Sequence, residues 1–181
     1  MPCLLRLCTK GLKGFRKFDE IYIFLANLPL GGYVFDALIG FFAPYSASTT
    51  PHVETLSKTA CTVSIEERPW LMNPFNSVHA VALTNIGELS SGLVMMTAMQ
   101  HSPVRMRGIP TKFEVEFFKK AKGKVYASST CSLDGVYEDC TIAVNSILSN
   151  SKGVELAKMT ASWNIRCNGT KQMGLESKKK G

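Results

Sequence analysis

The hydrophobic residues of this chain change their spacing twice, and that change limits the folds the chain can adopt. Cys61, Val63 and Ile65 alternate with polar residues, which is the period of a strand with one buried face. Apolar residues then recur at helical spacing across residues 79–98. After residue 110 the two-residue period returns in four segments. The sequence therefore predicts two strands, one long helix and four further strands, an α+β arrangement.

Two short helices are expected before the first strand. Apolar residues recur at helical spacing on both sides of a break at Pro29, which predicts helices at about 12–28 and 33–43. At 181 residues the chain is long enough for one domain with its own core. We expect a basic N-terminal helical extension at residues 1–43, a single domain at 44–169 and a lysine-rich flexible tail at 170–181.

The basic charge of the chain is concentrated at its two ends. The net charge is +7, but eight of the 21 basic residues lie in residues 1–18 and 178–180, which contain no acid. The remainder holds 13 basic and 14 acidic residues and is therefore nearly neutral. No aromatic residues interleave with the lysines as they do in nucleic-acid-binding modules, so we expect no nucleic-acid partner.

Cysteine spacing and apolar segments bear on metal binding and cellular location. The six cysteines include no C-x-x-C pair, so we expect no metal site and a reducing compartment. The most apolar region, residues 21–45, is interrupted by polar residues, proline and glycines, so we expect no transmembrane span. Residues 1–18 mix basic and apolar side chains without an acid, as a mitochondrial presequence or a basic first helix would. The expected location is cytoplasmic, or mitochondrial if this segment is a presequence.

The predicted central helix carries one acid near its middle. An apolar stripe follows one side of this helix and is formed by Ala82, Ile86, Leu89, Leu93 and Met96. Glu88 lies on the opposite side, with Thr84 and Ser91. Gly87 and Gly92 flank the acid, each at a cost of roughly 1 kcal/mol relative to alanine, which predicts close approach of another backbone. We infer a helix that is buried in the sheet and pressed against a partner subunit.

A polar turn, a histidine and this acid form the most specific motif of the chain. Asn73, His79 and Glu88 stand six and nine residues apart. The spacing resembles that of the acyl-CoA thioesterases of the hotdog fold, most closely the phenylacetyl-CoA thioesterase-like branch. Most of the chain is also similar to an uncharacterised hotdog family regarded as thioesterases, which shares Ala43-Pro-Tyr45, Ser77-Val-His79-Ala, Gly87-Glu88-Leu89 and Lys119-Lys-Ala121. The resemblance implies a curved antiparallel sheet wrapped around the central helix.

The resemblance also implies roles for individual residues. Glu88 would act as nucleophile or general base in thioester hydrolysis. The Ala80 N–H, at the start of the helix, would polarise the thioester carbonyl. Asn73 would orient water or substrate, and His79 is a further catalytic candidate. In hotdog enzymes the acid and the helix terminus of one site usually come from different subunits, so the resemblance implies a homodimer or a dimer of dimers.

The substrate implied by the resemblance is a thioester of coenzyme A or of an acyl-carrier protein, with no further cofactor. Hotdog proteins tend to bind the nucleotide of coenzyme A near the basic segment that follows the first strand after the helix. Lys119 and Lys120 are therefore the candidates for contacting its phosphates. Without that resemblance, a run of lysines of this kind is usually a solvated hairpin.

Two other functions remain open. The chain has His79-Ala80-Val81 where the thioesterase branch has His-Gly-Gly, which favours a non-catalytic module that binds acyl-CoA or serves in assembly. A hotdog dehydratase that pairs His79 with Glu88 is the other alternative. His79 and Asn73 also have structural interpretations, because a histidine can hydrogen-bond locally before a helix and asparagine suits a turn before proline.

Overall fold

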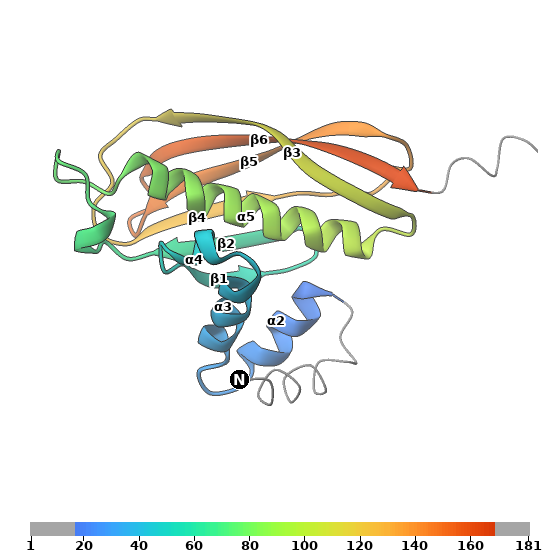
Figure 1. Ribbon diagram of the computed structural model, residues 1–181, viewed down its shortest axis with the longest axis horizontal. Helices are drawn as coiled ribbons and strands as arrows, with labels where there is room; N and C mark the ends of the chain where they lie inside the picture. Colours follow the sequence, from blue (N-terminus) through green and yellow to red (C-terminus); the bar gives the residue numbers. More distant parts are fainter. Residues whose placement is uncertain (1–16, 169–181) are drawn as a thin grey trace, which may run out of the picture.

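The fold is a six-stranded antiparallel sheet that bends around one long helix (Figure 1). The computed structural model describes residues 17–168. Its elements are α2 (Phe18–Ala26), α3 (Gly31–Phe42), α4 (Pro44–Ala47), β1 (His52–Leu56), β2 (Ala60–Ile65), the 3-10 turn η2 (Pro69–Leu71), α5 (Ala80–His101), β3 (Arg105–Phe117), β4 (Val125–Thr130), β5 (Cys140–Asn150) and β6 (Glu155–Asn168). The predicted order of two strands, one long helix and four strands is confirmed.

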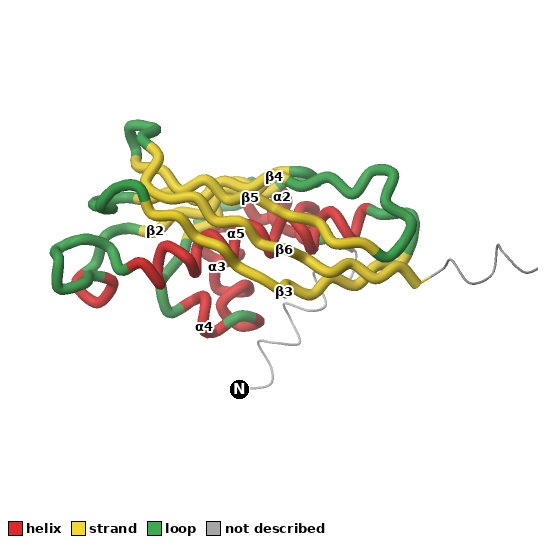
Figure 2. The backbone as a smooth tube through the Cα atoms, turned by 90° about the horizontal axis from the view of Figure 1, so that it is seen from above, coloured by secondary structure: helices red, strands yellow, loops and turns green. Residues whose placement is uncertain are grey.

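The strands lie in the order β1-β2-β4-β5-β6-β3, so β1 and β3 form the two edges. Every neighbouring pair is antiparallel. In β4 the residues Val125, Ala127 and Ser129 are buried and alternate with more exposed ones, as expected of a sheet with one face on the core. Figures 1 and 2 show that this covered face lies on α5.

The lysine-rich segment after β3 does not close a hairpin. β3 pairs with β6, whereas β4 pairs with β2 and β5, so residues 118–124 cross from one edge of the sheet to its middle. The crossing segment is held by Ala121, which is buried and whose carbonyl accepts a hydrogen bond from Val78 N at 2.9 Å. The hairpin interpretation is therefore wrong for this segment, because both edges of β4 are already paired with other strands.

α5 is buried on nearly every side. Ile86, Val94 and Met95 have no exposed surface, and Ser90, Ser91 and Thr97 are equally buried. A helix of this kind belongs to the middle of a fold and not to its surface. The predicted stripe is confirmed at its first four positions, but Met96 is 42% exposed. Met96 lies beside the start of β3 at the sheet edge, where no further strand within residues 17–168 covers the helix.

The two glycines of α5 contact side chains and not a second backbone. A Cβ atom at Gly87 would lie 3.1 Å from Met159 Sδ, so Gly87 makes room for that side chain. A Cβ atom at Gly92 would meet its nearest atom, Glu88 Oε1, at 3.7 Å, an ordinary contact. The close backbone approach expected at these positions is therefore not seen within the described part of the chain.

A cluster of three buried hydroxyl groups joins α5 to the sheet. Ser90 of α5 lies 2.7 Å from the hydroxyl of Ser129 on β4, and Ser129 lies 2.5 Å from that of Ser146 on β5. Ser146 also donates to the Gly87 carbonyl at 2.8 Å. Each hydroxyl therefore has a partner, which removes the cost of burying it and fixes the helix against the two central strands.

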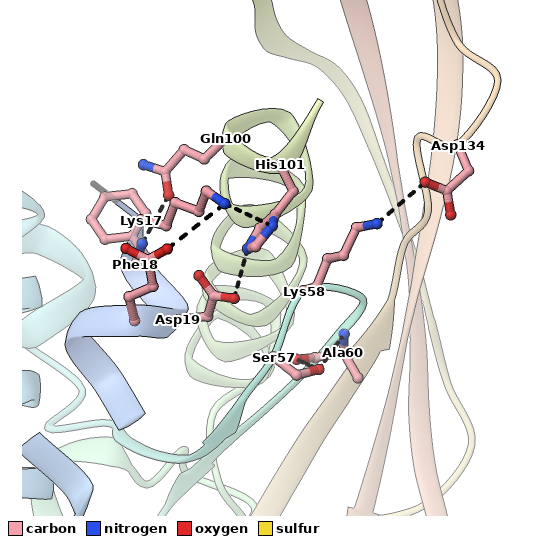
Figure 3. A network of polar contacts seen from close by, with 10 residues as sticks. Lys17, Phe18, Asp19, Ser57, Lys58, Ala60, Gln100, His101 and Asp134 are labelled. Carbon is pink, nitrogen blue, oxygen red and sulfur yellow. Dashed lines mark hydrogen bonds and ion pairs between the residues drawn. The ribbon is translucent and has the colours of Figure 1, made fainter. Parts of the chain in front are cut away.

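Polar contacts attach the N-terminal helices to the body at three places. Asp36 of α3 accepts a hydrogen bond from Val53 N at 2.9 Å and contacts His52 Nδ1 at 2.5 Å. The Tyr22 hydroxyl of α2 donates to the Glu54 carbonyl of β1 at 2.5 Å. At the third place, shown in Figure 3, Asp19 of α2 contacts His101 Nε2 at 2.7 Å, at the end of α5. The two predicted helices are confirmed as α2 and α3, whereas the short α4 was not predicted.

Several predictions concern residues outside the described range. The start of the first predicted helix near residue 12, the presequence and the tail at 170–181 all lie there. The proposed domain boundaries remain predictions. Within residues 17–168 no helix combines the length and the apolar character that crossing a bilayer requires.

Met95 and Met96 provide a matched test of the burial of α5. Met95→Ala should lower the free energy of unfolding by about 2–5 kcal/mol, because it leaves a cavity in the core. Met96→Ala should change it by less than about 0.5 kcal/mol, because that side chain is 42% exposed. Urea unfolding at one protein concentration measures both, and equal losses in the two variants would contradict this placement of the helix.

Candidate functional site

The N-terminus of α5 is capped by the histidine that precedes it. His79 Nδ1 accepts a hydrogen bond from Val81 N at 3.1 Å, and the His79 carbonyl accepts from Ala82 N at 2.9 Å. His79 N donates to the Leu71 carbonyl at 2.7 Å, which holds the turn in place. This geometry is the local hydrogen-bonding role considered for His79. The Ala80 N–H has no acceptor among residues 17–168, so it is the free donor of the first turn.

Asn73 organises the turn before this helix. Its Oδ1 atom accepts from Phe75 N at 3.0 Å and from Ser77 N at 3.2 Å. Its Nδ2 atom lies 3.0 Å from Ser77 Oγ. The amide group is thus engaged with the turn itself, which matches the turn-forming interpretation of Asn73. A substrate or water would compete with these bonds for the amide group.

One cavity of about 310 Å³ brings four of the six predicted site residues together. Asn73, Ala80, Lys119 and Lys120 all line it. The remaining walls are mainly apolar and are formed by Phe75, Ser77, Val78, Leu83, Phe117, Phe118 and Ala121. The cavity therefore combines a free N–H, two lysines and an apolar lining, which suits a ligand with an anionic end and an apolar end. Phe117 and Phe118 were not predicted, because in sequence they look like the end of a strand.

Glu88 does not line that cavity and lies on another side of α5. Its carboxyl group is half-buried and has no hydrogen-bond or ion-pair partner among the described residues. Burial raises the pKa of this carboxyl above its ordinary value, because the charged form loses hydration without gaining a partner. Such an unpaired, desolvated acid is the arrangement expected of a general base and is unusual for a purely structural residue.

Trp163 of β6 forms an apolar boundary near Glu88. The ideal Cβ position at Gly92 lies 3.7 Å from Glu88 Oε1 and 3.9 Å from two ring carbons of Trp163. The indole N–H of Trp163 is buried and has no acceptor within residues 17–168. The sequence placed Trp163 on a strand but carried no signal that it lies near the acid, because the two residues are 75 positions apart.

Glu88 does not join the four cavity-lining candidates within one copy of the chain. Glu88 follows Ala80 by eight residues on one straight helix, a separation of about 12 Å along the axis. His79 and Glu88 are nine residues apart, which places them about 180° apart around the helix. A single chain therefore presents the free N–H with the lysines in one place and the acid in another.

A second cavity, of about 390 Å³, lies between α3 and the first two strands. Its lining includes Asp36 and His52, whose contact also attaches α3 to β1. None of the predicted site residues lines this cavity. We assign the pair to fixing the helix, since Asp36 is satisfied by the Val53 N–H and by the imidazole.

Solved structures share this architecture over nearly their whole length. A structural-genomics protein of unstated function and organism matches with a TM-score of 0.69 at 25% identity, covering 83% of this chain and 99% of that one. A Pseudomonas aeruginosa protein of unknown function, described as a probable thioesterase, matches with a TM-score of 0.66 at 17% identity, covering 78% and 97%. The PaaI protein of E. coli, from the phenylacetic acid degradation operon, matches with a TM-score of 0.57 at 9% identity, covering 71% and 94%.

Comparison by sequence gives the family but no characterised relative. No curated protein matches this chain. A family model described as a domain of unknown function, DUF4442, matches residues 31–165. The match spans α3 to β6 and so includes the helix, the sheet and all candidate residues. This chain therefore has the hotdog fold and belongs to the DUF4442 family.

Proposed function

We propose that this protein hydrolyses acyl-CoA thioesters in a site shared between two copies of the chain. Glu88 of one copy acts as general base or nucleophile, and the Ala80 N–H of the other copy polarises the thioester carbonyl. The observation that carries the proposal is the half-buried Glu88 carboxyl, which has no partner among residues 17–168 and a raised pKa. The same chemistry would serve a thioester of an acyl-carrier protein.

Glu88 is suited to the base role by what surrounds it. A neighbouring cation or donor would stabilise the carboxylate and weaken it as a base, and the described residues supply neither. A raised pKa moves the acid closer to neutral pH, where a base combines sufficient basicity with a high ionised fraction. The ring of Trp163 lies near this carboxyl, on the other side of the Gly92 Cβ position.

Ala80 is suited to the role of oxyanion donor by its place on α5. The first N–H groups of a helix point outward with the positive end of the macrodipole, which favours an oxygen that gains negative charge. Val81 N is engaged by His79 and Ala82 N by the His79 carbonyl, which leaves Ala80 as the free donor toward the cavity. In this proposal His79 holds the donor in place and does not transfer a proton.

The edge strand β3 supports a shared site. β3 has 13 residues and pairs with β6 alone, so its other edge offers unpaired backbone groups. Ile109 on this strand is 66% exposed, and Phe113 and Phe117 are more than 40% exposed. These apolar side chains alternate with charged ones on a strand that also carries Pro110 and a register shift beside it. Pairing of β3 with a second copy would continue the sheet and make a two-fold homodimer, with a dimer of dimers as a further step.

The names of similar structures are consistent with this proposal. The Pseudomonas aeruginosa protein is described as a probable thioesterase, and PaaI belongs to a phenylacetic acid degradation operon. Their low identity shows the fold alone, so the acyl group is not transferred from them. A non-catalytic binding module is the alternative outcome, since Ala80 and Val81 replace the two glycines of the thioesterase branch.

The first prediction from this proposal concerns Glu88 and activity. Glu88→Gln should reduce thiol release from acyl-CoA at least about a thousandfold, because an amide can neither accept the proton nor attack the carbonyl. A panel of short, medium, long and aromatic acyl-CoAs measures this. The matched control is Glu138→Gln in an exposed loop, which should retain full activity. Full activity in Glu88→Gln would reject the assignment, and binding without turnover in the unmodified protein would favour the binding module.

The pH dependence of thiol release tests the role of Glu88 without any substitution. Thiol release should require the ionised Glu88 carboxylate, so kcat/KM should fall as pH is lowered. Because burial raises the pKa of Glu88, the midpoint of this acid limb should lie above the ordinary carboxyl value of 4.5. A limb at or below that value would mean that another group is the base.

A second prediction concerns Glu88 and stability. The folded-state pKa of Glu88 is raised, so its protonated form stabilises the folded state and that contribution is lost as pH rises through the folded-state pKa. Glu88→Gln should therefore be at least as stable as the unmodified protein at neutral pH. The advantage should vanish below pH 4.5, where the carboxyl is protonated in both states. Thermal unfolding across this range checks the sign, and a destabilised variant at neutral pH would show an undetected favourable partner.

A third prediction concerns Lys119 and Lys120. Replacing both by glutamine should raise KM roughly tenfold for acyl-CoA, because the lost charge-assisted hydrogen bonds are those to phosphate. KM for the matching acyl-pantetheine, which lacks the nucleotide phosphates, should stay unchanged. Lys112→Gln is the control, since Lys112 is already paired with Glu114 at 2.8 Å. Equal effects on both substrates would place the lysines outside the nucleotide subsite.

A further inference from the structure

The indole N–H of Trp163 is a buried donor without an acceptor. Trp163 is 5% exposed, and its Nε1 atom has no hydrogen-bond partner among residues 17–168. Two other buried side-chain atoms in that range, Asp19 Oδ1 and Thr97 Oγ1, are also unpaired. The other oxygen of Asp19 contacts His101, and Thr97 lies about 180° around α5 from the Glu88 position. Buried donors in native proteins nearly always have a partner, so the Trp163 N–H calls for an acceptor that the described residues do not supply.

The Glu88 carboxyl is a matching acceptor beside the same ring. It is half-buried, and no cation or donor stabilises it among the described residues. The ideal Cβ position at Gly92 lies 3.7 Å from Glu88 Oε1 and 3.9 Å from Trp163 Cζ2. Within the indole, Cζ2 and Nε1 are bonded to the same carbon, so the N–H lies next to the ring atoms that face Gly92. The unpaired donor and the unpaired acceptor therefore both lie close to Gly92, and no hydrogen bond joins them directly.

Packing within the described chain does not require glycine at position 92. A Cβ atom at Gly87 would lie 3.1 Å from Met159 Sδ, so that glycine makes room for a neighbouring side chain. Outside the backbone of α5, no atom lies closer than 3.7 Å to the Cβ position at Gly92. Alanine would fit there and is the better helix former. A side chain at this position would instead fill the space between the carboxyl and the indole.

We propose that Trp163 and Glu88 hold the attacking water of the thioesterase reaction between them, beside the backbone of Gly92. This inference rests on the proposed function and gives Glu88 the role of general base. Water suits the position because it accepts from the indole N–H and donates to the carboxylate at the same time. A cation would satisfy only the carboxylate, and an anion would satisfy only the indole.

The two contacts orient the water for attack. One O–H donates to Glu88 and one lone pair accepts from Trp163, which leaves the second lone pair for the thioester carbonyl carbon. The water oxygen forms the C–O bond while Glu88 takes its proton. The C–S bond then breaks, and the proton passes from Glu88 to the leaving thiolate. The products are a carboxylic acid and a thiol, and Glu88 is again a carboxylate.

Trp163→Phe tests the donor, because it removes the N–H and keeps an aromatic ring. We expect kcat for thiol release from acyl-CoA to fall roughly tenfold, with KM unchanged, since the water and not the substrate loses its hydrogen bond. The matched control is Trp70→Phe, which should retain full activity because Trp70 is 60% exposed and does not line the candidate cavity. In a Glu88→Gln background Trp163→Phe should cause no further loss, because both groups act on the same water.

Gly92→Ala tests the space between the two groups. It should raise Tm by about 2–4 °C, because alanine favours the helix and meets no close atom. It should nevertheless lower kcat at least about tenfold, because the methyl group displaces the water. Loss of activity in a more stable variant cannot come from unfolding. A single turnover in isotopically labelled water gives a further readout: the product acid should carry one labelled oxygen, and the peptide that contains Glu88 should carry none.

The outcomes separate this inference from the proposed function. An active protein in which Trp163→Phe and Gly92→Ala both keep full kcat would overturn the inference alone. So would labelled oxygen in Glu88, which would make that residue the nucleophile, or a Trp163→Phe variant in which KM rises and kcat does not change. If Trp163→Phe does not fold, Gly92→Ala and the labelling decide. No thiol release by the unmodified chain, or full activity in Glu88→Gln, would reject the proposed function and this inference with it.

Discussion

The burial of α5 inside the sheet is the constraint on which the rest of this structure depends. Ile86, Val94 and Met95 have no exposed surface, and the strands packed on α5 range from β2 at residues 60–65 to β6 at residues 155–168. Burial on this scale contributes roughly 1.5–3 kcal/mol for each fully buried large side chain. It also fixes the direction of α5, and so the place of its N-terminal donor and of Glu88. The positions of both candidate groups therefore follow from the burial of α5 in the sheet.

Two polar side chains of α5, Ser90 and Glu88, differ in whether they have hydrogen-bond partners among the described residues. Ser90 forms hydrogen bonds with hydroxyl groups on β4 and β5, so its burial costs little. Glu88, two residues earlier, is half-buried without a partner in the described part of the chain, and its pKa is raised. Leaving the Glu88 carboxyl half-buried without a partner lowers the stability of the folded state, whereas the paired Ser90 hydroxyl causes no such loss. Perturbed pKa values of this kind cluster at functional sites, which supports the proposal for Glu88.

The free edge of β3 is a second feature of the fold that bears on the proposed site. Among residues 17–168 this edge offers a row of backbone groups as well as exposed apolar side chains, and it therefore suits another strand. We propose that a second copy of the chain pairs there.

The sequence by itself determined the order of the strands and the long helix, and four of the five positions in the buried stripe of α5, because periodicity is a property of neighbouring residues. It also singled out Glu88, whose role as the acid stays a proposal. For His79 the sequence favoured a local hydrogen-bonding role, and for Asn73 it left the turn-forming and the catalytic interpretation equally open. Only the tertiary structure placed β3 beside β6, exposed Met96 at the sheet edge and brought Trp163 near Glu88. Those outcomes depend on which distant strands pair, and pairing is set by the summed burial of the whole sheet, which no local pattern contains.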